Sequence, residues 1–172
     1  MSCQFRNVFT FQNIPPQATQ IIITTKQISS SITNTNSRSV KWLVRTAEEL
    51  YAAAAVATEI VLANDIIGLN NICVLSSGKE ITLNGNGHTL TSSADRAINV
   101  RGAYKATIKN LTINASGERA INIIQNSKEV IIDNVTATAA NYTVNVASSA
   151  PGAKVTIHNS TLDGLTVVNV AS

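Results

Sequence analysis

The feature that most constrains this fold is a tripeptide motif, an apolar residue, Asn and a second apolar residue, that returns at nearly constant spacing. Its asparagines are separated by 23, 23 and 24 residues: Asn99, Asn122, Asn145 and Asn169. A second asparagine series recurs after 24 and 25 residues: Asn110, Asn134 and Asn159. Because both series share one period, and periods of roughly 20–50 residues are typical of stacked repeats, the chain is predicted to be a solenoid.

Each repeat contains short segments in which apolar and polar residues alternate, such as Leu111-Thr112-Ile113 and Val155-Thr156-Ile157. This alternation is typical of a strand with one buried face, and no repeat contains a helical pattern. Such a unit buries its apolar face only by stacking on its neighbours, about 4.8 Å apart. The predicted fold class is all-β, a single-stranded right-handed parallel β-helix. With only 4% aromatic residues, its core must be filled by small β-branched side chains.

The sequence before the repeats predicts an arm and a capping helix. Residues 1–39 are rich in Ser, Thr, Asn and Gln and are expected to form an extended N-terminal arm, whereas residues 40–172 form the β-helix domain. Thr46 followed by Glu49 is a capping box, which predicts a helix over about residues 47–57. A helix before the first coil would cover one end of the apolar stack.

Three runs of sequence carry a resemblance to a known group of proteins: residues 46–50, 60–66 and 78–90. Over roughly residues 40–172 the chain resembles the pectate-lyase-like β-helix modules of Gram-positive surface proteins. The resemblance implies the same fold. It does not imply one activity, because that group includes lyases, hydrolases and non-catalytic adhesive domains.

The polar series are predicted to have different roles. Asparagine tolerates left-handed backbone at a tight corner and its amides can stack, so Asn110, Asn134 and Asn159 are predicted to form a structural ladder. Two further series are predicted to be exposed rows, suited to plain solvation or to binding sugars, ordered water or another subunit: Asn99, Asn122, Asn145 and Asn169, and Thr89, Thr112, Thr136 and Thr161.

Two acid–arginine pairs and two histidines are the candidate reactive groups. Asp95-Arg96 and Glu118-Arg119 hold equivalent places in successive coils, where stacked rows could bind calcium or a uronate. The next coil has Asn141-Tyr142 instead, which favours a neutralising ladder of ion pairs. His88 and His158 have no sequence neighbours in a catalytic arrangement. We therefore predict no catalytic, cofactor-binding or metal-binding residues, no cofactor and no enzymatic activity.

The two ends of the repeat domain are predicted to carry assembly surfaces. The last strand is expected to be uncapped, and unpaired strand edges above an apolar core are sticky. The arm contains two strand-like segments suited to strand addition. The residues assigned to assembly are Cys3, Phe9, Phe11, Ile21, Ile22, Ile23, Val168 and Val170. Because the two ends differ, their contact would be heterologous and would give a homo-oligomeric, head-to-tail filament.

The leading functional hypothesis is a non-catalytic, self-assembling subunit of a surface fibre or appendage. A carbohydrate-binding adhesive domain, with surface glycans as partners, is the first alternative, and a divergent polysaccharide lyase is the second. The expected location is the cell or spore surface or an extracellular fibre, reached without a classical signal peptide, or the cytoplasm if assembly does not occur outside.

Composition argues against two further classes of partner. The net charge of +3 comes without a basic run, so nucleic-acid binding is not expected. No apolar stretch reaches membrane-spanning length, so no membrane span is expected. Cys3 and Cys73 are expected to be free thiols, with one bridge within or between chains left open.

Overall fold

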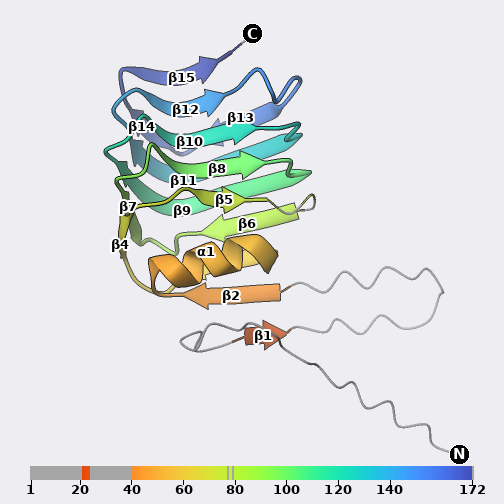
Figure 1. Cartoon of the computed structure of the whole chain (residues 1–172), viewed down its shortest axis with the longest axis vertical. Helices are drawn as coiled ribbons and strands as arrows, with labels where there is room; N and C mark the ends of the chain where they lie inside the picture. The colour runs from red at the N-terminus through yellow and green to blue at the C-terminus, as the bar shows by residue number, and fades with distance from the viewer. Residues whose placement is uncertain (1–20, 24–39, 77, 79, 172) are drawn as a thin grey trace, which may run out of the picture.

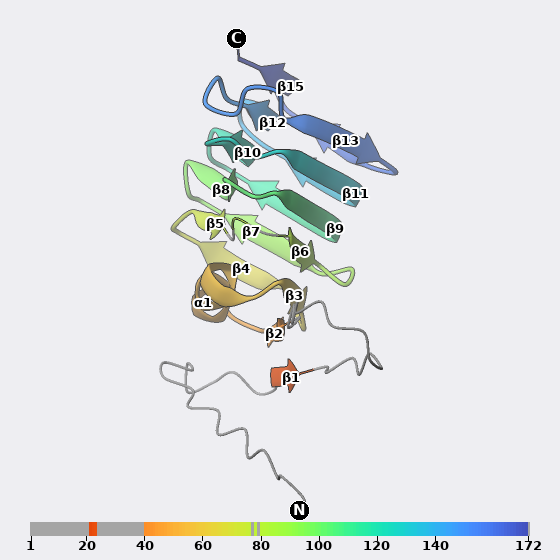
Figure 2. The same cartoon turned by 90° about the vertical axis from the view of Figure 1, so that its right-hand side faces the viewer.

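The chain folds into a right-handed β-solenoid, in a computed structural model that describes residues 21–23, 40–76, 78 and 80–171. Parallel coils stack along one axis, from β2 near one end to β15 at the other (Figure 1; Figure 2). A first sheet of ten strands forms two sides of the solenoid, and a second sheet of five strands, one per coil, forms the third side. The predicted parallel β-helix is therefore confirmed.

The one described helix is α1 (Ala47–Val56). The first sheet contains β1 (Ile21–Ile23), β2 (Val40–Val44), β3 (Glu59–Leu62), β4 (Ile66–Leu69), β6 (Glu80–Asn84), β7 (Thr89–Ser92), β9 (Lys105–Ala115), β11 (Glu129–Thr138), β13 (Lys154–His158) and β14 (Thr161–Asp163). The second sheet contains β5 (Cys73–Leu75), β8 (Arg96–Arg101), β10 (Arg119–Ile124), β12 (Tyr142–Val146) and β15 (Thr166–Val170).

The register of the strands follows the sequence period. In the second sheet Asn122 lies opposite both Asn99 and Asn145, and Asn145 also lies opposite Asn169. The core positions stack in the same way: Ile98, Ile121 and Val144 are register partners, and all three are fully buried. Each buried aliphatic side chain of this kind stabilises the fold by about 1.5–3 kcal/mol.

β9 and β11 each cover two sides of the solenoid because they bend in the middle. The bends lie at Asn110 (φ 52°) and Asn134 (φ 54°), and Asn159 (φ 50°) turns the chain at the same corner between β13 and β14. Left-handed backbone costs most L-residues roughly 1–2 kcal/mol, and asparagine is one of the few that adopt it routinely. The corner asparagines therefore turn the strand while its pairing continues.

α1 closes the apolar stack next to β5. The Thr46 Oγ1 accepts a hydrogen bond from the Glu49 backbone nitrogen at 3.2 Å, and the Glu49 Oε2 accepts one from the Arg45 backbone nitrogen at 2.7 Å. The first bond satisfies a nitrogen that a helix start leaves without a partner, and the second ties Glu49 to Arg45, the residue before the N-cap. Leu50 and Ala53 are buried against the first coils. The helix begins and ends within one residue of the predicted range.

A column of alternating charge runs along the first sheet. Lys105 lies in register between Glu80 and Glu129, and Lys154 follows Glu129. The Nζ atoms of Lys105 and Lys154 lie 3.8 and 3.7 Å from the two carboxylate oxygens of Glu129. Exposed pairs contribute at most about 1 kcal/mol each. A slipped register would separate them, so the column favours the observed alignment.

β1 pairs antiparallel with β2 of the same chain, with Ile21 opposite Trp42 and Ile23 opposite Val40. The sequence prediction assigned Ile21, Ile22 and Ile23 to contacts between copies, whereas the structure places one edge of their strand against β2. Cys3, Phe9 and Phe11, the other arm residues assigned to assembly, lie outside the described residues.

The last coil carries core-type side chains that are exposed. Val168 and Val170 are 43% and 70% exposed, whereas their register partners Val144 and Val146 are 0% and 7% exposed. The difference arises because no other coil of the described residues stacks on β15.

Candidate functional site

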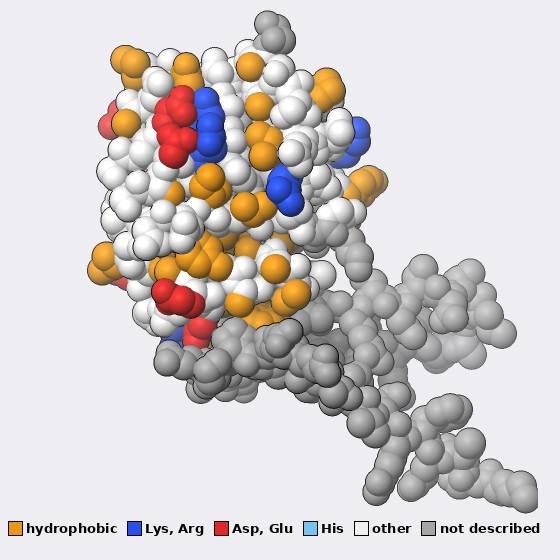
Figure 3. Space-filling model, in the orientation of Figure 1, with side chains coloured by type: hydrophobic (Ala, Val, Ile, Leu, Met, Phe, Trp, Pro, Cys, Tyr) orange, Lys and Arg blue, Asp and Glu red, His pale blue; other side chains and the backbone are white. Residues whose placement is uncertain are grey.

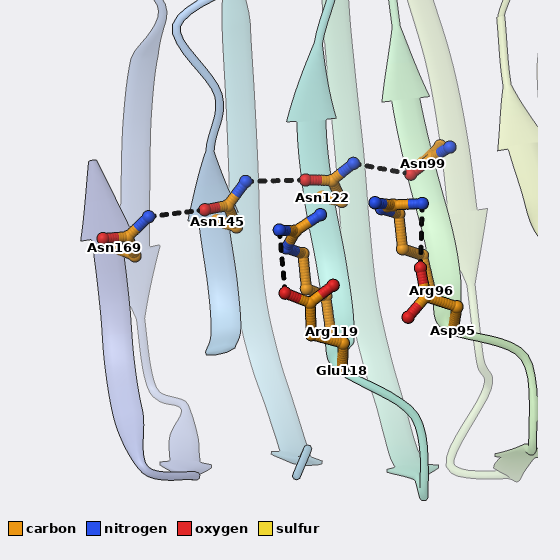
Figure 4. A network of polar contacts seen from close by, with 8 residues as sticks. All are labelled: Asp95, Arg96, Asn99, Glu118, Arg119, Asn122, Asn145 and Asn169. Atoms are coloured by element: carbon orange, nitrogen blue, oxygen red, sulfur yellow. Dashed lines mark hydrogen bonds and ion pairs between the residues drawn. The ribbon is translucent and has the colours of Figure 1, made fainter. Parts of the chain in front are cut away.

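The asparagines of the second sheet are joined by hydrogen bonds from coil to coil (Figure 4). The Nδ2 of Asn122 donates to the Oδ1 of Asn99 at 2.9 Å, and the Nδ2 of Asn145 donates to the Oδ1 of Asn122 at 2.7 Å. The Nδ2 of Asn169 then donates to the Oδ1 of Asn145 at 2.6 Å. We call these four residues the groove ladder.

The groove ladder corrects the prediction of an exposed asparagine row. Asn99, Asn122 and Asn145 are only 8%, 3% and 4% exposed, and Asn169 is half-buried. The prediction that these side chains face away from the core was sound, because Ile98 and Val100 on either side of Asn99 are buried in the core. The prediction that they face open solvent was wrong, because neighbouring side chains shield them.

The shielding comes from a column of longer side chains beside the ladder. Arg96, Arg119 and Tyr142 are register partners in β8, β10 and β12, and Figure 4 shows the two arginines reaching alongside the asparagines. A groove of about 390 Å³ remains above the ladder. Its lining consists of Arg96, Asn99, Arg119, Asn122, Ile124, Tyr142, Asn145, Ala147, Ser148, Asn169 and Ala171.

Each arginine of the groove is paired with the acid directly before it. The Nη1 of Arg96 lies 2.9 Å from the Oδ2 of Asp95, and the Nη2 of Arg119 lies 3.0 Å from the Oε1 of Glu118. Acidic and basic side chains accordingly lie side by side on this face of the molecule (Figure 3). These are the residues predicted to neutralise one another, and the pairs form within each coil rather than between coils.

Arg119 has two further features. Its guanidinium carbon lies 5.5 Å from the centre of the Tyr142 ring, within the range of a cation–π contact. Its Nε is buried and has no hydrogen-bond partner among the described residues. A buried donor without a partner costs about 1–3 kcal/mol and calls for an explanation. The groove therefore has one donor whose bonding is incomplete.

A second ladder lies at the corner between the two sides of the first sheet. The Nδ2 of Asn134 donates to the Oδ1 of Asn110 at 2.9 Å, and the Nδ2 of Asn110 donates to the Oδ1 of Asn84 at 3.1 Å. The Nδ2 of Asn159 instead donates to the Oδ1 of Asp133 at 3.0 Å. The predicted ladder of Asn110, Asn134 and Asn159 is thus corrected: it includes Asn84 and does not extend to Asn159.

The threonine series forms one column along β7, β9, β11 and β14. Thr112 lies opposite both Thr89 and Thr136, and Thr136 also lies opposite Thr161. Thr89 and Thr112 are half-buried, whereas Thr136 and Thr161 are exposed. The column therefore becomes more exposed toward the C-terminal end.

His88 lies beside a carboxylate contributed by the preceding coil. The Asp65 Oδ1 accepts a hydrogen bond from the Thr89 backbone nitrogen at 2.8 Å and lies 3.3 Å from the Nδ1 of His88. The Thr89 hydrogen bond is the main reason why the pKa of Asp65 lies below its ordinary value. The two residues are 23 positions apart, one period of the repeat, so this spacing could have indicated the pair. His158 is exposed.

Cys73 is free and fully buried in β5, and burial raises the pKa of its thiol to about 12. Within the described ranges, no three His, Cys, Asp or Glu side chains lie close enough to hold a metal ion. α1 has ten residues and is too short to cross a membrane.

Sequence reasoning missed Tyr142 and Asn84 as members of these polar columns. Tyr142 takes the place of an arginine in the repeat, so only its position, one period after Arg119, indicated its role. Asn84 lies 26 residues before Asn110, off the period of the ladder. No protein-family model, curated protein or solved structure matches this chain.

Proposed function

We propose that this chain is a non-catalytic structural protein that associates with copies of itself through its last coil, as the subunit of a surface fibre or appendage. The observation that supports this most directly is the exposure of Val168 and Val170, whose register partners in the coil below are buried. Apolar side chains and a strand edge are presented there together. Covering them with another coil would bury apolar area and pair free backbone groups.

The partner proposed for the last coil is a second copy of the chain in head-to-tail orientation. β13 and β1 are the two terminal strands along the main path of the first sheet. If β13 of one copy paired with β1 of the next, that sheet would continue from copy to copy. Because the two surfaces differ, the contact would be heterologous and would repeat indefinitely or close into a ring.

The proposal includes a place among cell-surface proteins. Its support is the resemblance of residues 46–50, 60–66 and 78–90 to pectate-lyase-like β-helix modules of Gram-positive surface proteins, together with the solenoid fold. A cell or spore surface, or an extracellular fibre, is the proposed location. The fold is compatible with several activities, so the case for assembly depends on the last coil.

The test is the size of the 172-residue protein in solution, measured by analytical ultracentrifugation and negative-stain microscopy. We expect filaments or rings whose amount rises with protein concentration. The double variant Val168→Lys/Val170→Lys should remain monomeric, because it places charges on the contact. The matched control is Ile67→Lys, which changes an equally apolar side chain, 79% exposed, on the side of the solenoid.

Deleting residues 1–39 removes β1 and tests the head-to-tail orientation separately. The truncated protein should no longer assemble, while its circular dichroism should still show a folded β-protein. A monomeric full chain at all concentrations would overturn the proposal, as would assembly by the double variant equal to that of the Ile67→Lys control. Assembly of the truncated protein at the full-chain level would overturn the head-to-tail arrangement.

A further inference from the structure

The outward side chains of β6, β13 and the first halves of β9 and β11 make up one face of the solenoid (Figure 2). Each strand contributes three of them, because the residues in between point into the core, where Leu83, Ile108 and Ile132 are fully buried. We call this surface the charged face. The column of alternating charge runs along one margin of it, in the order Glu80, Lys105, Glu129 and Lys154.

A second polar column runs along the opposite margin, four residues further along each strand: Asn84, Lys109, Asp133 and His158. Between the two margins lies a column of uncharged β-branched side chains: Thr82, Thr107, Ile131 and Thr156. From β6 to β13 the charges of the first column are therefore negative, positive, negative and positive. Those of the second column are neutral, positive, negative and, with histidine counted as neutral, neutral.

These two charge orders are complementary to themselves in a second copy that is turned end over end. The second copy is generated by half a turn about an axis that is parallel to the strands, lies in the plane of contact and passes midway between β9 and β11. Each column then faces itself in reverse order. The opposed charges, one from each copy, are Glu80 with Lys154, Lys105 with Glu129, and Lys109 with Asp133. In this antiparallel arrangement every charge of the two columns meets an opposite charge.

A parallel arrangement of two copies brings like charges together instead. Half a turn about the direction of the solenoid axis places the first column opposite the second column at the same height. Lys105 then faces Lys109 of the second copy, and Glu129 faces its Asp133. Opposed like charges disfavour association and thereby select between orientations. The charged face therefore distinguishes an antiparallel partner from a parallel one.

We infer that the charged face binds the same face of a second copy, with the two solenoids side by side and antiparallel. The contact is isologous, because each copy contributes the same surface. This goes beyond the proposed function, which concerns the ends of the molecule. Nucleic acid fits this face less well, because its lysines alternate with acids and form no basic stripe. The uncharged column in the middle is the part of the contact from which water is removed at least cost.

The charged face is small, which sets the strength of the contact. Four strands at a spacing of about 4.8 Å cover much less than the roughly 800 Å² per partner of a stable complex. Opposed charges at its margins fix the orientation more than they add affinity. Two single chains should therefore pair weakly, at high protein concentration and low salt. In about 1 M salt, where charges are screened beyond about 3 Å, they should separate.

The first test traps the weak dimer with a short linker. The background chain is Cys3→Ser/Val168→Lys/Val170→Lys, which blocks the contact at the last coil and keeps only the thiol of Cys73. That thiol does not react, because it is fully buried. Thr82→Cys and Thr156→Cys are made separately in this background. The variants are treated with a bismaleimide linker of about 10 Å, the usual separation of two packed sheets.

In the antiparallel arrangement, position 82 faces position 156 of the second copy. An equimolar mixture of the two cysteine variants should therefore give a linked dimer that contains one of each, identified by its mass. Either variant alone should give little, because its two thiols lie three coil spacings, about 14 Å, apart along the axis. In the parallel arrangement each position faces itself. Linking of either variant alone at the level of the mixture, or no linked dimer in low salt, would overturn the inference.

The second test reverses charges in the same background. Lys105→Glu sets an acid opposite Glu129 of the second copy, and Glu129→Lys sets a base opposite its Lys105. Each variant alone should dimerise about tenfold or more weakly than the background chain, because attraction becomes repulsion at two symmetry-related places. An equimolar mixture of the two should dimerise again, since each added acid then meets an added base. Dimerisation is measured by analytical ultracentrifugation at low salt, and circular dichroism checks the fold.

The matched control is a mixture of Arg101→Glu and Glu48→Lys, which change the net charge equally but lie outside the charged face, in β8 and α1. Both residues are exposed. Alone or mixed, these variants should dimerise like the background chain. Equal weakening by the controls would overturn the inference, as would a mixture of Lys105→Glu and Glu129→Lys that dimerises no better than either alone. The contact at the last coil is measured separately in about 1 M salt, where the lateral contact is screened, so the two proposals fail independently.

Discussion

The Nδ2 of Asn122 donates to the Oδ1 of Asn99 across a distance of 2.9 Å, in a place where neither side chain is more than 8% exposed. The same bond is repeated from Asn145 to Asn122. Asn122 is therefore both donor and acceptor, and its removal breaks two bonds. Because water has little access to these amides, their lost partners are not readily replaced.

Asn122→Val is expected to destabilise the fold by about 2 kcal/mol, since it leaves the Asn99 oxygen and one Asn145 N–H without partners. The measurement is the free energy of unfolding from urea denaturation. Asn114→Val is the matched control, because Asn114 is exposed on β9. Its effect should stay within about 0.5 kcal/mol. Equal effects of the two substitutions would show that the groove ladder contributes nothing to the free energy of unfolding.

Asn110→Ala and Asn110→Gly separate the backbone and hydrogen-bond roles of the corner asparagine. Both remove the bonds to Asn84 and Asn134, but only Ala strains the left-handed backbone at φ 52°. Asn110→Ala should therefore be less stable than Asn110→Gly by about 1 kcal/mol in urea denaturation. Equal stability of the two variants would contradict the assigned role of the φ angle.

Gly117→Ala tests the closest approach between coils. A Cβ at position 117 would collide with the backbone oxygen of Ala94 in the coil below, and backbone cannot move aside as a flexible side chain can. We expect a loss of about 3 kcal/mol or more, or failure to fold, seen by circular dichroism and by the soluble yield. Gly152→Ala is the control: its Cβ meets open space, so only the strain at φ 72° remains, about 1 kcal/mol.

Cys73 should be unreactive and should make stability fall at high pH. Burial raises the pKa of its thiol to about 12, from about 9 in the unfolded chain. Below pH 9 the thiol is protonated in both the folded and the unfolded chain, so Cys73 does not lower the free energy of unfolding there. Between pH 9 and about 12 only the unfolded state ionises, and Cys73 subtracts about 1.4 kcal/mol per pH unit.

The measurement for Cys73 uses a Cys3→Ser background, so that one thiol remains. Thiol labelling at pH 8 should be negligible until urea unfolds the protein. Adding Cys73→Ala should make the fall in stability above pH 9 less steep, and the difference between the two curves isolates the thiol from other groups that titrate there. Rapid labelling of the folded protein would contradict the burial of Cys73.

The sequence period was sufficient to predict the coils and the register of the second sheet. A solenoid places residues one period apart directly above one another, so Asn99, Asn122 and Asn145 had to align once the fold was recognised. The helix was predictable for a local reason, because Thr46 and Glu49 interact within one turn. In each case the residue spacing that forms the sequence pattern is also the spacing that brings the residues into contact in the structure.

The exposure of the asparagines was harder to predict. It depends on the way in which extended side chains of one column cover the side chains of the next column. The alternation around Asn122 shows which face it occupies, but not that Arg119 and Tyr142 would shield that face. The prediction that the corner ladder extends to Asn159 was wrong for a related reason. The register aligns position 134 with position 159, but the amide of Asn159 donates to Asp133, the residue before Asn134.

The groove ladder also gives the solenoid a side-chain dipole along its axis. Each amide donates toward the N-terminal coils and accepts from the C-terminal side, so the side-chain dipoles add, as peptide dipoles do in a helix. Figure 4 shows the oxygen of Asn169 pointing away from Asn145, which makes the last coil the negative pole. Two such coils placed face to face would set oxygen against oxygen, so the dipoles oppose tail-to-tail pairing and favour a partner that presents an N–H.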